Sequence, residues 1–153
     1  MPTFTDNSDT TVRIAWNIVA DNGSPISSYV ITLRAVNTNF YSTSVCNGAD
    51  ATIAANRYCD IPMSTLTSLP FALLQGTLIV AKVQAINEEG LGLISDPNLS
   101  GAAIALIPHK PPTPPTMTSQ SSTSISINMP SVTLTETGGS SILSYNLEFK
   151  ESS

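Results

Sequence analysis

Apolar and polar residues alternate one by one along several stretches of this chain, and this period of two constrains its fold more than any other feature. In the stretch 10–17, Val12, Ile14 and Trp16 fall on one face with polar residues between them, as expected of a half-buried strand. The same alternation places further apolar sets on one face of two later strands: Tyr29, Ile31 and Leu33, then Ile79, Ala81, Val83 and Ala85. No window shows the 3.6-residue stripe of an amphipathic helix. The chain is therefore predicted to be all-β.

Weaker signals complete the predicted strand order. Asn, Gly and Pro at 21–25 supply the chemistry of a turn, because Asn and Gly tolerate positive φ and Pro presets a bend. Residues 37–56 are irregular and predict an excursion between two sheets. The stretch 59–66 predicts an edge or bulged strand because it contains Pro62, and 94–107 predicts a final strand pair.

The pattern restarts beyond a proline-rich stretch. Five prolines in 108–115 fix φ and bias their predecessors away from helix, which predicts an extended spacer. Residues 115–118 then repeat 2–5 at an offset of 113 (115 − 2), and 139–147 repeat 23–31 at an offset of 116 (145 − 29). Such self-similarity indicates tandem units. We predict a complete domain at 1–107, a linker at 108–115 and a partial second domain at 116–153.

Three of these segments resemble fibronectin type III repeats. They are the Trp-bearing strand 12–16, the turn and strand start at 21–29, and the strand with its turn at 81–90. The resemblance implies an immunoglobulin-like β-sandwich, followed here by the first strands of a second one. Within the family, the cysteine-bracketed segment before 61–64 is similar to repeats of very large surface or secreted proteins of single-celled eukaryotes.

The chain departs from the family pattern at two places. Ile79 stands where members usually carry a tyrosine, so the hydrogen bond that anchors that corner is absent. Met129-Pro130 lies near the position of Trp16 in the second unit, which predicts different packing there. No Arg-Gly-Asp tripeptide occurs, so the integrin binding of some relatives does not carry over.

The two cysteines, Cys46 and Cys59, are 13 residues apart (59 − 46). This spacing suits a disulfide, which over so short a loop would add on the order of 3 kcal/mol. Two reduced core cysteines are the alternative, and a zinc site fits less well because four ligands are needed and the single histidine, His109, lies far along the chain. A disulfide would indicate an oxidising compartment.

Charge and hydropathy exclude two classes of partner. Six basic residues are scattered singly against eleven acidic ones, for a net charge of −5, whereas nucleic-acid binding needs a clustered basic face. We therefore expect no nucleic acid as partner. No apolar stretch reaches the length of a membrane span, so no membrane insertion is expected within this segment.

Catalysis and cofactor binding are not expected either. A nucleophile needs a neighbouring base held by a third group, and the one histidine lies in the spacer. Carboxylates for acid–base work would have to come from Asp60, Glu88, Glu89 or Asp96, which are better explained as solvated loop residues. The run Asp6-Asn7-Ser8-Asp9 offers oxygen ligands for Ca²⁺, but it also suits a polar loop, so no metal site is assigned.

Two sequons permit N-glycosylation in a secretory pathway, Asn22-Gly23-Ser24 and Asn98-Leu99-Ser100. Asn98 is expected to be the better acceptor because Pro25 follows the first sequon closely in a tight turn. The Ser/Thr run 116–126 suits O-linked sugars or a solvated strand edge equally well.

The partial second unit predicts where other molecules bind. Two apolar faces there cannot be covered by three strands alone, and they consist of Ile125, Ile127, Met129, Ile142, Tyr145, Leu147 and Phe149. Either strands beyond this segment cover them, or another chain adds strands in a head-to-tail filament.

These features predict a non-enzymatic structural or adhesive repeat module of an extracellular or cell-surface array. Its partners would be adjacent domains or identical subunits, with glycans as a further possibility. The alternative is a ligand-binding module of a surface receptor, for which Phe40, Tyr41 and Tyr58 are weak candidates. A third reading, the accessory domain of a secreted enzyme, requires a catalytic domain elsewhere.

Overall fold

A computed structural model describes the backbone of residues 3–8 and all of residues 10–150. The chain divides into two compact units, residues 1–104 and 105–153. The first contains β1 (Thr3–Ser8), β2 (Thr11–Trp16), β3 (Ser28–Arg34), β4 (Phe40–Tyr41), η1 (Ser44–Cys46), α1 (Ala51–Asn56), β5 (Tyr58–Pro62), α2 (Met63–Thr67), β6 (Ala81–Asn87) and β7 (Gly90–Leu91). The second contains β8 (Thr116–Gln120) and β9 (Ile125–Asn128).

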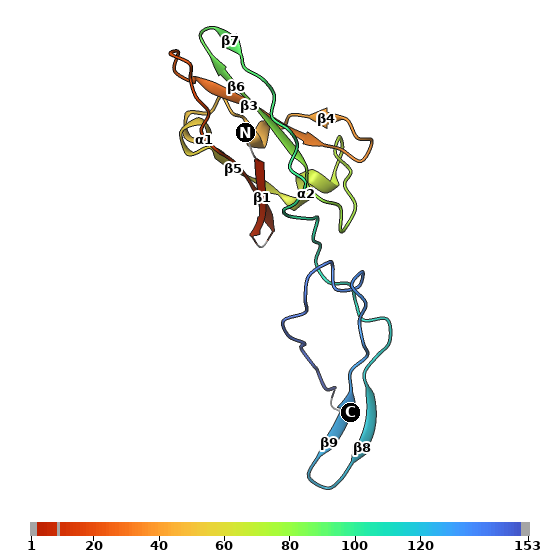
Figure 1. Cartoon of the computed structure of the whole chain (residues 1–153). Helices are drawn as coiled ribbons and strands as arrows, with labels where there is room; N and C mark the ends of the chain where they lie inside the picture. The colour runs from red at the N-terminus through yellow and green to blue at the C-terminus, as the bar shows by residue number, and fades with distance from the viewer. Residues whose placement is uncertain (1–2, 9, 151–153) are drawn as a thin grey trace. The chain divides into compact units, whose positions relative to one another are not determined.

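The first unit is a sandwich of two antiparallel sheets (Figure 1). One sheet has the strand order β1-β2-β5 and the other β4-β3-β6-β7. β3 and β6 form the centre of the second sheet, in register from Ser28 opposite Ile86 to Leu33 opposite Ala81. The three strands with the clearest alternation are β2, β3 and β6, and the predicted all-β class is confirmed.

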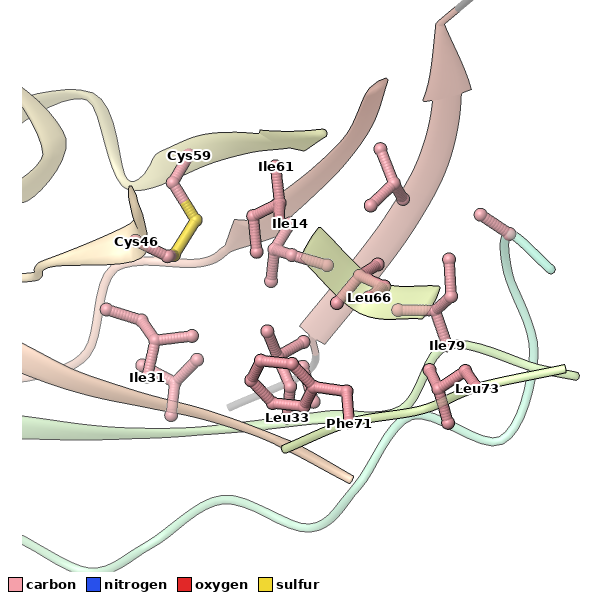
Figure 2. Packing of buried hydrophobic residues seen from close by; sticks show 14 of the residues in the cluster. Ile14, Ile31, Leu33, Cys46, Cys59, Ile61, Leu66, Phe71, Leu73 and Ile79 are labelled. Carbon is pink, nitrogen blue, oxygen red and sulfur yellow. A yellow bond between two sulfur atoms is a disulfide. The ribbon is translucent and has the colours of Figure 1, made fainter. Parts of the chain in front are cut away.

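The hydrophobic core lies between the facing surfaces of these sheets (Figure 2). Ile14 and Ile61 reach it from the three-stranded sheet, Ile31 and Leu33 from the four-stranded sheet, and Phe71 from the segment after α2. In β2, β3 and β6 every second residue points inward, and these inward residues are the apolar ones that alternate in the sequence. Each such side chain stabilises the fold by about 1.5–3 kcal/mol on burial.

The irregular region between β4 and β5 contains the disulfide and a short helix. Cys46 ends η1, Cys59 lies in β5, and their sulfur atoms are bonded within the core. The helix α1 begins where Asp50 Oδ1 accepts hydrogen bonds from the N–H groups of Thr52 (2.8 Å) and Ile53 (3.1 Å). The disulfide thus ties this segment to β5.

The sequence predicted a single strand over 59–66, and this prediction is wrong. β5 ends at Pro62 and α2 begins at Met63. Proline has no N–H to continue the ladder, and β5 is an edge strand, as Pro62 indicated. In α2, Met63 and Leu66 are buried, because residues three apart lie on the same face of a helical turn.

The predicted final strand pair at 94–107 is also wrong. Only an isolated bridge between Leu78 and Ala103 remains of it. The segment nevertheless follows β6, because Ser95 N–H donates to the Val83 carbonyl oxygen (2.9 Å). Pro97 lacks a backbone donor, so a regular ladder cannot continue through it.

The second unit contains one antiparallel hairpin, β8–β9, with a register shift between Met117 and Ser119. Residues 141–150 have no regular secondary structure, so the third strand expected in this unit is not formed there. In the first unit the corresponding strand, β3, is held by β6, and no β6-like partner occurs among residues 105–150. The predicted spacer makes backbone hydrogen bonds within this unit, since His109 N–H donates to the Glu136 carbonyl oxygen (2.8 Å).

Candidate interaction surfaces

Asn98, the sequon residue preferred from the sequence, is buried and fully engaged. Its side chain is 8% exposed. Its Nδ2 group donates to the carbonyl oxygens of Ile79 (2.9 Å) and Ser100 (3.0 Å), and its Oδ1 accepts from Ala81 N–H (2.7 Å). Both amide hydrogens are therefore used inside the fold, and a glycan attached to Nδ2 would replace one of these hydrogen bonds. The folded domain thus disfavours Asn98 as an acceptor, and its glycosylation stays a prediction.

In the irregular segment after β7, the Asn98 side chain makes the backbone hydrogen bonds that a paired strand would otherwise make. Its amide is shaped like a peptide group, so it satisfies one donor and one acceptor on the segment that leads into β6. Ser95 acts in the same way nearby, because its Oγ accepts from Val83 N–H (3.0 Å). The sequence signal was the polar pair Ser95 and Asn98 on either side of Pro97, which lies within the stretch predicted as a final strand pair.

Asn22, the other sequon residue, is exposed. It has φ 52° and is followed by Gly23 with φ 91°, and the turn is closed by Ser24 N–H donating to the Asp21 carbonyl oxygen (3.1 Å). The tight turn predicted here is present. Its tightness leaves the Asn22 side chain on the surface.

The outer face of the three-stranded sheet has a charged cluster. Arg13 and Asp60 lie opposite each other on β2 and β5 and form a two-pronged ion pair, with Arg13 Nε and Nη2 each 2.7 Å from a carboxylate oxygen. The Arg13 guanidinium also lies 3.9 Å from the ring centroid of Tyr58. Hydrogen bonding by Arg13 lowers the pKa of Asp60. Asp60, considered above for acid–base work, is thus an ion-pair partner.

The three aromatic residues considered for ligand binding do not form one surface. Tyr58 belongs to the three-stranded sheet, whereas Phe40 and Tyr41 form β4 in the other. Lys82 Nζ lies 4.4 Å from the ring centroid of Phe40. Hydrogen bonds from the amides of Asn37 and Asn39 to its hydroxyl lower the pKa of Tyr41. No shared aromatic site follows from these positions.

The remaining catalytic and metal candidates are on the surface or outside the described residues. Glu88 and Glu89 are exposed in the turn between β6 and β7, and His109 is exposed. The side chains of Asp6-Asn7-Ser8-Asp9 lie outside the part that the structure describes. Within that part, no three His, Cys, Asp or Glu side chains come together as metal ligands. No helix in the same residues is long and apolar enough to span a bilayer.

The apolar residues of the second unit are the largest difference between the two units. At the offset of 113, Ile125, Ile127 and Met129 correspond to Val12, Ile14 and Trp16; at 116, Tyr145, Leu147 and Phe149 correspond to Tyr29, Ile31 and Leu33. The six residues of the first unit are all buried. Of their counterparts, Ile127 and Met129 are half-buried and the others are exposed, up to 72% for Phe149. The second unit thus has apolar residues at the positions that form the core of the first unit, but the described residues leave most of them exposed.

The hairpin of the second unit also differs from the first unit in its strand pairing. In the first unit β2 pairs with β1 on one side and with β5 on the other. In the second unit, β9 pairs only with β8 among residues 105–150. One edge of β9 therefore has no strand beside it, and an unpaired edge is a template for strand addition.

Facing antiparallel sheets of three and four strands around one core define an immunoglobulin-like β-sandwich. A family model, the fibronectin type III domain, matches residues 2–99. The chain therefore belongs to the fibronectin type III family, as the motifs at 12–16, 21–29 and 81–90 predicted. Members of this family are generally binding or structural modules and not enzymes.

Proposed function

We propose that this chain is a structural module of an extracellular array, in which the second unit is completed by strands from a second copy. The observation that supports this most strongly is the exposure of residues whose counterparts in the first unit form its core. By analogy with those counterparts, the added strands would be a β5-like strand beside β9 and a second sheet over the apolar face.

The energetics favour such completion. Burying one large apolar side chain stabilises a complex by about 1.5–3 kcal/mol, and the exposed set contains Ile125, Tyr145, Leu147 and Phe149. Backbone hydrogen bonds at the β9 edge would add register and direction, as in other strand-addition complexes. An interaction between different surfaces of two copies is heterologous and extends head to tail into a filament unless it closes as a ring.

The extracellular placement is supported by the family and by the disulfide. Disulfides persist in oxidising compartments and are rare in the cytosol, and Cys46–Cys59 is bonded and buried in the core. The exposed sequon at Asn22 suits the same setting.

Sedimentation velocity over about 10 μM to 1 mM tests the assembly. We expect the mass of the full chain to rise with concentration above that of one copy. The variant Ile125→Thr/Ile127→Thr keeps β-branched residues in β9 but removes apolar surface, and we expect at least tenfold weaker association. The matched control is Leu99→Ser, which alters an equally apolar exposed residue of the first unit and should associate like the parent.

A parent chain that stays monomeric to 1 mM would contradict the proposal. So would a β9 variant that associates as strongly as the parent, because the interface would then lie elsewhere.

A further inference from the structure

A groove of about 630 Å³ lies at the end of the first unit where the loop after β2 meets the turn between β6 and β7. The β7 turn is labelled in Figure 1. The groove is lined by Val19, Ala20, Asp21, Asn22, Ser24 and Ile26 from one loop and by Ala85, Asn87 and residues 89–96 from the other side. Its volume is within the range of ligand-binding clefts. Sequence reasoning missed it, because its two sides are far apart in the sequence: Asn87 and Ser24, which are hydrogen-bonded at the groove, are 63 residues apart.

Hydrogen bonds hold the two sides of the groove in place. The Asn87 Nδ2 group donates across it to the carbonyl oxygens of Asp21 (3.4 Å) and Ser24 (3.2 Å), and its Oδ1 accepts from Glu89 N–H (3.0 Å). The Gln84 Nε2 group donates to the Gly92 carbonyl oxygen (2.7 Å). The groove is thus formed before any partner binds, which lowers the entropic cost of binding.

The chemistry of the groove is both apolar and acidic. Leu91, Leu93 and Ile94 are all exposed, and Leu93 is 97% exposed. The lining includes the carboxylates of Asp21, Glu89 and Asp96, but no Lys, Arg or His. A partner that fits this surface carries apolar side chains next to positive charge.

We propose that the groove binds the segment 105–112 of a second copy of this chain. Leu106 and Ile107 are exposed and lie beside His109 and Lys110, which are also exposed. Arg13 is paired with Asp60, and Lys82 lies over Phe40. Lys150 is exposed beside the exposed Phe149, but no proline restricts that segment. Prolines at 108, 111 and 112 restrict the segment before binding, as in other proline-rich ligands of preformed grooves.

This interaction is separate from the strand pairing proposed above. The groove belongs to the first unit and the hairpin to the second, and they share no residue. A peptide carrying only the spacer sequence cannot complete the hairpin. Its binding therefore tests the groove alone, whatever the outcome of the sedimentation experiment.

The test is fluorescence anisotropy of a labelled peptide with the sequence of residues 105–115, titrated with unglycosylated full-length chain, because Asn22 lines the groove. The chain carries Lys110→Glu so that its own spacer does not compete. We expect saturable binding with Kd of about 0.1–1 mM, weakened by added salt because charges contribute. Glu89→Gln/Asp96→Asn should weaken it about threefold to tenfold, and Leu93→Ser at least threefold.

Two matched controls separate groove effects from general ones. Glu148→Gln removes a carboxylate from the second unit and Leu99→Ser removes an exposed leucine outside the groove; neither should change the Kd. A peptide with Lys110→Glu should bind at least fivefold more weakly than the parent peptide. Absence of saturable binding to 2 mM overturns the proposal, and so does equal binding by the groove variants or by the charge-reversed peptide.

Discussion

Asn98→Ala is the substitution that most sharply tests how the first unit is held together. It removes the acceptor for Ala81 N–H and the donor to the carbonyl oxygens of Ile79 and Ser100. A buried polar group that loses its partner costs about 1–3 kcal/mol. Since at least two buried backbone groups are affected, we expect the free energy of unfolding to fall by about 3 kcal/mol, a large fraction of the 5–15 kcal/mol typical of a domain.

Urea unfolding followed by tryptophan emission measures this loss. Trp16 is the only tryptophan, is 3% exposed and packs edge-on against Tyr29 with ring centroids 5.2 Å apart, so its emission reports on the first unit. Ser100→Ala is the control, because it destroys the sequon yet keeps the Ser100 carbonyl oxygen. It should stay within about 0.5 kcal/mol of the parent.

Asn98→Asp adds a second, independent comparison. It keeps an oxygen for Ala81 N–H but places the other oxygen against two carbonyl oxygens, so we expect a loss at neutral pH at least as large as that of Asn98→Ala. The loss should shrink as pH falls, because a protonated carboxyl can donate again. If Asn98→Ala unfolds within 0.5 kcal/mol of the parent, the bridging role of this side chain is refuted.

Three further predictions concern the disulfide, the ion pair and the sequon. Cys46→Ala/Cys59→Ala should lower the free energy of unfolding by about 3 kcal/mol in the same urea assay, and an unchanged midpoint would contradict this. Asp60→Asn should cost about 0.5–1 kcal/mol at pH 7. Because Arg13 lowers the pKa of Asp60 in the folded state, this contribution is present above about pH 4 and is lost as pH falls through the folded pKa; a parent–variant difference that stays constant from pH 7 to 2 would refute it. Secretion from a eukaryotic host should attach a glycan that Asn22→Gln removes, and mass spectrometry that finds the glycan elsewhere on the folded chain would overturn this assignment.

The sandwich was predictable because its central strands are strongly amphipathic. Val12, Ile14 and Trp16 alternate with polar residues, and all three are buried as predicted. What the alternation missed was α2, where Pro62 ends a strand and the next residues turn into a helix. Local periodicity does not show such a switch when the segment is only five residues long.

The candidate surfaces were harder to predict because they depend on contacts distant in sequence. Asn98 resembles any exposed sequon until Ile79 and Ala81 are placed beside it. The groove exists only once the loop after β2 and the β7 turn meet. The apolar residues of the second unit could be named from sequence because they form two apolar faces in a repeat of the first unit. For most of them, such as Phe149 with Leu33, the repeat offset leads to a buried residue of the first unit.

Amide hydrogen exchange of β9 at low and high chain concentration tests the proposed completion by a second copy most directly. Strand addition would protect the β9 amides that β8 does not bind, so their exchange should slow at least tenfold between about 10 μM and 1 mM. The amides of β2, already paired on both sides, should exchange at the same rate at both concentrations. If the β9 amides exchange equally fast throughout, the hairpin is not completed by a second copy, and the proposed mode of assembly is wrong.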